Sequence, residues 1–150
     1  MGSASIEVKL QELDKLVRKL QSYTLSDSDK IRLLTSLGMI IEEQTKERFD
    51  TKRDPDGNEW RNITDKYRKY LARHFPGSRP PLEREGLLRM SIESRIKGTD
   101  TIVVGSPMEY AGYHQDAKSE KRRRMFLGFG TDNINELGEA VDVFMREHVA

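Results

Sequence analysis

The sequence contains no cysteine among its 150 residues. This absence excludes disulfide bonds, zinc sites built from thiolates and cysteine nucleophiles. The sequence also contains no apolar run that approaches the roughly 20 residues a transmembrane helix needs. Its first residues lack the basic and then apolar pattern of a secretory signal. We therefore expect no disulfide framework, no membrane partner and no export of the protein.

The sequence carries almost no net charge. Its 26 lysines and arginines balance 25 aspartates and glutamates to a formal charge of +1, so no global field draws the chain to nucleic acid. Hydrophobic residues make up 35% of the chain and charged residues 34%, which predicts a modest core beneath a heavily ionised surface. A chain of this length can bury one core, so we expect a single domain over residues 1–150.

The N-terminal third shows the apolar spacing of two amphipathic helices. Residues 6–21 and residues 26–49 each place apolar side chains at steps of three and four, and Ser26 can cap the second helix. We expect a helical hairpin over residues 6–49. Residues 1–5 before it are expected to be disordered or to derive from the expression vector. The apolar residues are Ile6, Leu10, Leu13, Val17 and Leu20 in the first helix, and Ile31, Leu34, Leu37, Ile41 and Phe49 in the second.

Turn-forming residues interrupt the chain after this hairpin. Asp54-Pro55-Asp56-Gly57 is a strong turn, and Trp60, the only tryptophan, follows it. A third helix can begin near Thr64, and the proline-rich stretch 75–81 cannot continue it because proline removes backbone donors. We expect this stretch and the basic loop 116–123 to be exposed and mobile.

Alternating apolar residues then predict an antiparallel β-hairpin. Residues 90–97 alternate apolar and polar side chains, residues 101–105 are apolar and mostly β-branched, and Gly98-Thr99-Asp100 forms a turn between them. Thr131 or Asp132 is expected to cap a last amphipathic helix that reaches about Val149. Its apolar stripe consists of Ile134, Leu137, Val141, Phe144 and Met145.

This order of elements predicts an α+β fold class, with amphipathic helices packed on a small antiparallel β-sheet or hairpin. Residues 50–150 form the α+β part. Two strands alone are only marginally stable. We therefore expect either a further strand near residues 124–129 or a sheet that neighbouring subunits extend.

No pattern of catalytic, cofactor-binding or metal-binding residues stands out, and we assign none. His114 has Glu109 and Asp116 nearby, but their spacing matches no known ligand pattern, so a hydrogen-bonded structural histidine is favoured. The residues after Asp54 match a calcium loop only in part, because Glu59 occupies the sixth position where glycine is needed. A plain turn is the better interpretation. No Gly-x-Ser-x-Gly motif appears, although two distant acids could still converge in the fold.

Charge is distributed unevenly along the second half of the chain. Residues 61–89 hold eight lysines and arginines against three acids, and residues 118–124 add five basic residues. The last helix holds five acids against Arg146. Such runs are consistent with a solvated surface, with phosphate contact or with an interface between oppositely charged subunits. The possible interface residues are Arg122, Arg123, Glu136, Glu139 and Asp142.

Four short motifs follow one another along the chain. They are a Pro-Asp-Gly turn before a tryptophan, a Gly-Leu-Leu segment before the hairpin, a Val-Gly step followed by Tyr-Ala-x-x-His-Gln, and Arg-x-Phe-Leu-Gly. Their residues include Pro55, Asp56, Gly57, Trp60, Gly86, Leu87, Gly105, Tyr110, Ala111, His114, Gln115, Arg124, Phe126, Leu127 and Gly128. In this order, over roughly residues 30–148, they resemble the phage virion morphogenesis family of tail-completion proteins from Mu-like and related contractile-tailed phages.

The resemblance implies a non-enzymatic structural protein of a phage or prophage, which acts as a ring in tail completion or head–tail joining. Its partners would be other tail or neck proteins and further copies of itself, without a cofactor. It would be found in the virion and, during assembly, in the host cytoplasm. Two alternatives stay open: a nucleic-acid-binding module that uses the basic loops 61–89 and 118–124, and a small hydrolase.

The motif residues also suggest structural roles. Trp60, Tyr110 and Phe126 have the size and character of buried anchors. His114 and Gln115 could tie their turn to backbone groups, because both side chains can donate and accept hydrogen bonds.

Overall fold

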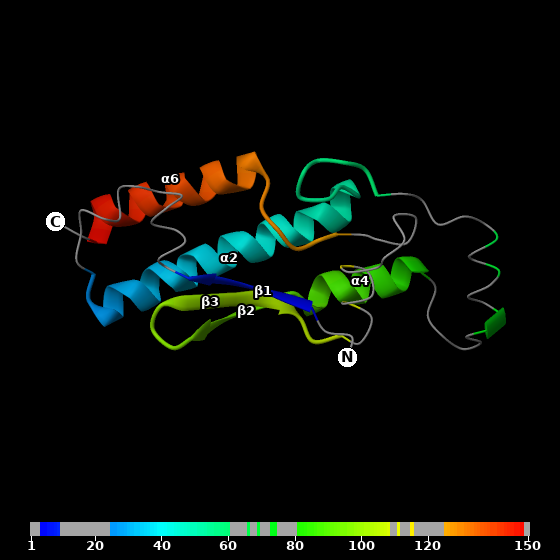
Figure 1. Ribbon diagram of the computed structural model, residues 1–150, viewed down its shortest axis with the longest axis horizontal. Coiled ribbons are helices and arrows are strands. Elements are labelled where there is room, and N and C mark those ends of the chain that lie inside the picture. The colour runs from blue at the N-terminus through cyan, green and yellow to red at the C-terminus, as the bar shows by residue number, and fades with distance from the viewer. Residues whose placement is uncertain are drawn as a thin grey trace.

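The computed structural model describes residues 4–9, 25–60, 66, 69, 73–74, 81–108, 111, 115 and 125–148. Within these residues, three strands and three helices make one arrangement of helices on a small sheet (Figure 1). The expected α+β class is therefore confirmed. Among these helices, none combines the length and the apolar character that a membrane span requires. Of the expected third helix near Thr64, only residues 66, 69 and 73–74 are described, and they are helical. Most of the stretch 75–81 and the loop 116–123 lie outside the described residues.

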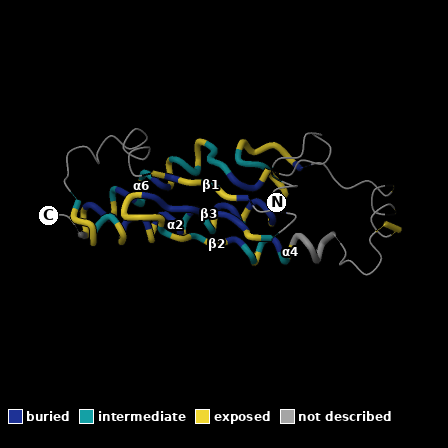
Figure 2. The backbone as a smooth tube through the Cα atoms, turned by 60° about the horizontal axis from the view of Figure 1, so that its bottom comes forward, coloured by how far each residue is buried: buried dark blue, intermediate teal, exposed yellow. Residues whose placement is uncertain are grey.

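The sheet has three antiparallel strands in the order β1-β3-β2. Strand β3, Thr101–Ser106, lies in the centre, and it pairs with β1, Ala4–Lys9, on one side and with β2, Glu93–Lys97, on the other. Every residue of β3 is buried, whereas the residues of β2 alternate between exposed and half-buried (Figure 2). The central strand thus belongs to the core, and β2 forms an edge.

Strand β1 corrects two expectations. Residues 6–9 form this strand and not the start of a helix, and Ala4 and Ser5 pair with β3 although residues 1–5 are expected to be disordered. Ile6 and Val8 alternate with charged residues, which is the period of two that a strand shows. Ile6 also fits the helical period of 3.6, so the two patterns overlap in the sequence. The third strand therefore comes from the N-terminal region. The described residues 125–129 form no strand, so this part of the expectation is wrong.

The β-hairpin is confirmed, with a later start. Strands β2 and β3 pair in the expected register around Gly98-Thr99-Asp100, but Met90 and Ser91 belong to the helix α4, Pro81–Ser91. Proline is suited to the first turn of a helix, because the N–H that it lacks would have no partner there. Pro81 therefore begins a helix and does not extend the preceding loop.

Helix α2, Asp27–Thr51, is the centre of the fold. It begins as expected, since the Ser26 hydroxyl accepts a hydrogen bond from the Asp29 N–H at 3.1 Å. The helix contacts β2 and β3 on one side and α6, Thr131–His148, on another (Figure 1). Its buried apolar residues join those of the sheet and α6 in one core; they include Leu33, Leu34, Leu37 and Ile41.

Helix α6 confirms the expected apolar stripe. Leu137, Val141, Phe144 and Met145 are buried, and Ile134 is half-buried. The cap differs from the expectation, because the helix already begins at Thr131. Gly130 precedes the helix, and the Asn133 side chain accepts the Gly130 N–H at 2.8 Å. This contact resembles half of a capping box, and it fixes the point at which the chain enters α6.

Candidate functional site

The C-terminal end of α2 is the place where most of the described motif residues meet. We define the α2 junction as residues 48–60 together with residues 125–133. These two segments are far apart in the sequence, but side-chain and ring contacts join them. The junction is the candidate functional site.

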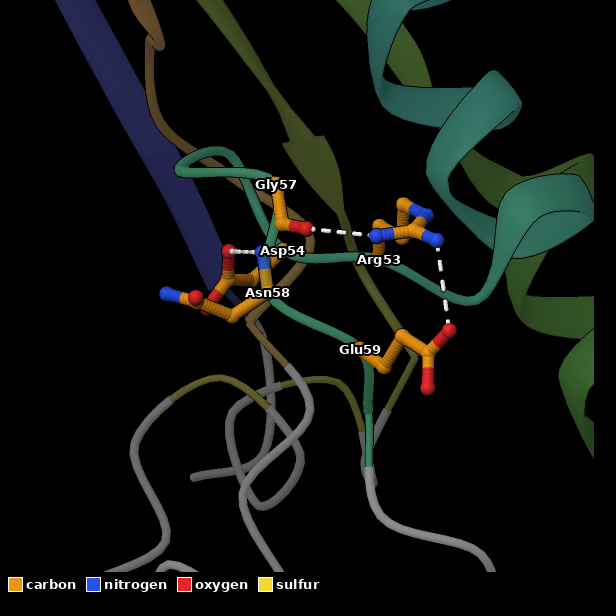
Figure 3. A network of polar contacts seen from close by, with 5 residues as sticks. All are labelled: Arg53, Asp54, Gly57, Asn58 and Glu59. Carbon is orange, nitrogen blue, oxygen red and sulfur yellow. Dashed lines mark hydrogen bonds and ion pairs between the residues drawn. The ribbon is translucent and has the colours of Figure 1, made fainter.

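The expected turn forms one wall of the junction (Figure 3). One oxygen of the Asp54 carboxylate accepts the N–H groups of Asp56 and Asn58, both at 2.9 Å. The Arg53 guanidinium donates to the Gly57 carbonyl at 2.8 Å and contacts the Glu59 carboxylate at 3.2 Å. The turn is thus held by its own side chains. Within the described residues, no group of three or more histidines, aspartates or glutamates has the arrangement of a metal site.

Trp60 is buried as predicted, with 8% of its surface exposed. Its indole Nε1–H donates to the Met125 carbonyl at 3.0 Å. Its ring packs edge-to-face on Phe49 at a centroid distance of 5.3 Å, and Phe49 in turn contacts Phe126 at 5.4 Å. These three rings connect α2, the turn and residues 125–130, so that the aromatic cluster fixes the junction from within.

Gln115 ties its turn to the junction, as the sequence suggested. Its Oε1 accepts the N–H groups of Phe126 and Leu127 at 2.9 and 3.0 Å, and its Nε2 donates to the Leu127 carbonyl at 3.0 Å. Ala111, four positions before Gln115 in the chain, is fully buried. Tyr110, His114 and Arg124 lie outside the described residues.

Arg48 is the residue that sequence reasoning missed. It is buried in α2 and donates to the carbonyls of Phe126 and Gly128 at 2.6 and 2.8 Å, and to the Asn133 side chain at 2.9 Å. Burial lowers the pKa of its guanidinium to about 10, while the carboxylates of Asp54 and Glu47 oppose this shift. The Arg48 guanidinium thus binds three acceptors and holds residues 126–133 against α2. A signal was present in the sequence, because Arg48 continues the buried helical face of Leu37, Ile41 and Gln44.

Glycines allow the two segments to touch. A Cβ on Gly128, which has a φ of 140°, would lie 3.0 Å from the Pro55 side chain. A Cβ on Gly130 would overlap the Pro55 carbonyl. A side chain at either position would therefore push the Pro-Asp-Gly turn away from residues 128–130.

The remaining predicted residues lie away from the junction. Gly105 lies near the C-terminal end of β3, paired with Ser5 of β1 and Glu93 of β2. Gly86 and Leu87 belong to α4, so the Gly-Leu-Leu motif does not begin a strand, and its buried residue is Leu88.

The residues of the possible interface are described only on the acidic side. Glu136 and Glu139 are exposed on α6, and Asp142 is half-buried. Arg122 and Arg123 lie outside the described residues.

A shallow hollow of about 350 Å³ opens beside the junction. The C-terminal part of α2, the turn and the first residues of α6 surround it, and four of its thirteen lining residues are acidic. Its lining residues include Gln44, Glu47, Arg48, Asp54, Asp56 and Asp132.

Comparison with known proteins agrees with the motifs. The model of the phage virion morphogenesis family matches residues 8–145. A relative, the Mu-like prophage FluMu G protein 1 of Haemophilus influenzae, is 27% identical over 98 residues, which cover 65% of this chain and 67% of the relative. No solved structure matches the chain. Because the family model spans nearly the whole sequence, the chain belongs to the phage virion morphogenesis family.

Proposed function

We propose that this chain is a ring-forming part of a phage tail that completes the tail or joins it to the head, and that it works without catalysis. The family assigns the chain a structural or assembly role in a phage. The ring, the place of action in the tail and the absence of catalysis go beyond this family role and are our proposal.

The observation that carries the proposal is the use of polar side chains in the α2 junction. Arg48, Gln115 and Asp54 all direct their polar atoms at backbone groups of the same chain. An enzyme would need a nucleophile, an acid or a base aimed at a substrate. Polar groups that form hydrogen bonds within the chain instead make the junction rigid. A rigid surface suits a protein that must fit between other virion proteins.

The ring follows from the distribution of charge. Helix α6 exposes Glu136 and Glu139, while residues 118–124 contain five lysines and arginines. When two different surfaces of one chain meet head to tail, the contact repeats and can close into a ring. Opposite charge steers such surfaces together and sets their register, whereas apolar contacts supply most of the affinity, because exposed ion pairs contribute only about 0–1 kcal/mol each.

Charge reversal tests this proposal. Glu136→Lys with Glu139→Lys should leave the fold intact, since both side chains are exposed, but should prevent tail completion in a complementation assay. Arg122→Glu with Arg123→Glu in the same chain should restore part of the activity. Glu43→Lys with Glu93→Lys is the matched control, because it changes two exposed acids outside α6. Full activity of the α6 variant would reject the ring contact proposed here.

A further inference from the structure

The β-sheet ends in an open edge at β2. Strand β2 pairs with β3 on one side, and within the described residues no strand pairs with its other side. In Figure 2 it runs along the lower margin of the described chain. The backbone N–H and C=O groups that point away from β3 on such an edge have no strand partner, so the edge can accept a further strand.

The inner face of β2 is incompletely covered. Ser94 and Ile96 are half-buried on the side of the sheet that faces α2, where a Cβ on Gly38 would lie 2.9 Å from the Ser94 hydroxyl. Ile96 packs against the core but is not enclosed by it. A strand added to this edge would cover the remaining exposed surface of Ile96.

The outer face of β2 carries charges that the described chain leaves without partners. Glu93, Arg95 and Lys97 are exposed on this face. Lys97 forms an ion pair with Glu7 of β1 at 3.1 Å. No hydrogen bond or ion pair holds the side chain of Glu93 or of Arg95 within the described residues. These two opposite charges are therefore available to a partner strand.

The sequence of this edge is complementary to itself. It reads Ile92-Glu93-Ser94-Arg95-Ile96. Two copies can pair antiparallel with Ser94 at the centre. Glu93 of each copy then lies opposite Arg95 of the other, and Ile92 likewise lies opposite Ile96. Opposite charges and apolar side chains in directly opposed positions both stabilise a pair of strands.

Other registers lack this match. A shift by two residues brings Arg95 opposite Arg95 or Glu93 opposite Glu93, and like charges in opposed positions destabilise the pair. A shift by one residue turns the charged face of one copy toward the α2 side of the other. The charge pattern therefore favours a second copy of this chain as the partner, and it favours one register.

We propose that the open edge of β2 binds β2 of a second copy and joins the two three-stranded sheets into one continuous antiparallel sheet. This contact is two-fold, so it is complete with two copies and cannot build a ring. Helix α2 separates it from α6, where the ring contact is placed (Figure 1). The dimer is thus a state of the free chain that goes beyond the proposed ring, and its loss should leave tail completion intact.

Sedimentation equilibrium over a series of protein concentrations measures this dimer. Arg95→Glu and Glu93→Arg each put like charges opposite each other at both symmetric positions, and each should weaken self-association about tenfold. The double variant Glu93→Arg with Arg95→Glu should restore it, because the exchanged charges are again complementary. An equimolar mixture of the two single variants should also associate. Lys9→Glu is the matched control, because it makes the same change of charge on β1 at the other edge of the sheet.

Amide hydrogen exchange locates the contact. Protection within residues 92–96 should rise with concentration in the wild type and in the mixture, but not in either single variant alone. A wild type that stays monomeric throughout the series would overturn the proposal, as would equal association of the wild type and both single variants. If Glu136→Lys with Glu139→Lys abolishes association while the β2 variants do not, the ring contact accounts for it and the β2 pairing is rejected.

Discussion

Near its N-terminal end, α2 buries Leu33, Leu34 and Leu37 in a core shared with Ile102 and Val104 of the sheet, whereas near its C-terminal end it buries Gln44 and Arg48. The first region is held by apolar contact, which has no preferred direction and tolerates small adjustments. The second also has a ring cluster of Phe49, Trp60 and Phe126, and it adds hydrogen bonds of fixed geometry that join residues about 80 positions apart. The junction is therefore the region where one substitution leaves several polar groups unpaired.

The largest effect is expected from Trp60→Ala, which removes the ring that joins Phe49 to residues 125–130. We expect a loss of about 3–5 kcal/mol in the free energy of unfolding, because a large buried ring is lost and a cavity remains. Urea denaturation measures this loss. Trp60→Phe is the matched control: it keeps a ring but not the hydrogen bond to Met125, and it should cost less. Unchanged stability of the alanine variant would show that the aromatic cluster does not hold the junction.

Arg48→Met should follow, with a loss of about 2–4 kcal/mol, because three acceptors of residues 126–133 lose their charged donor. Arg48→Lys should fall between the methionine variant and the wild type, since it keeps the charge but cannot reach all three acceptors. Amide hydrogen exchange should accelerate at residues 126–133 more than in β3. Uniform acceleration over both regions would contradict separate modes of stabilisation.

Gln115→Ala should have a smaller effect, about 1–3 kcal/mol, because it leaves the N–H groups of Phe126 and Leu127 without their acceptor. Gln115→Glu keeps the accepting oxygen but loses the donor to the Leu127 carbonyl. The glutamate variant should therefore lose less stability than the alanine variant in thermal denaturation. The opposite order would mean that the donated bond dominates.

The smallest effect is expected from pH. Burial lowers the Arg48 pKa to about 10, so the folded protein holds this proton less tightly than the unfolded chain does. Above about pH 10 and below the higher pKa of the unfolded chain, the unfolded chain would bind more protons, and this group would make stability rise with pH. Below about 10 both states stay protonated. The stability difference between the wild type and Arg48→Met should therefore be constant from about pH 6 to 9, and a slope in that difference would indicate another titrating partner.

Local sequence patterns determined much of this protein. The helical stripe and the Ser26 cap determined α2, the alternation around Gly98-Thr99-Asp100 determined the β-hairpin, and the Pro-Asp-Gly pattern determined the turn before Trp60. Each of these signals acts between residues that are close in the chain. Burial of Trp60 also followed from its residue type, since a lone large ring after a tight turn is best placed in a core.

Other features depend on contacts between residues that are far apart in the chain. Residues 6–9 fit either a helix or a strand, and the open edge of β3 selected the strand by offering backbone partners across about 95 positions. Arg48 continues the buried helical face of α2, but its partners, the carbonyls of Phe126 and Gly128, come from the other end of the chain. The acidic hollow likewise combines α2, the turn and the start of α6. Because these contacts are long-range and depend on how whole elements pack, no local pattern specifies them.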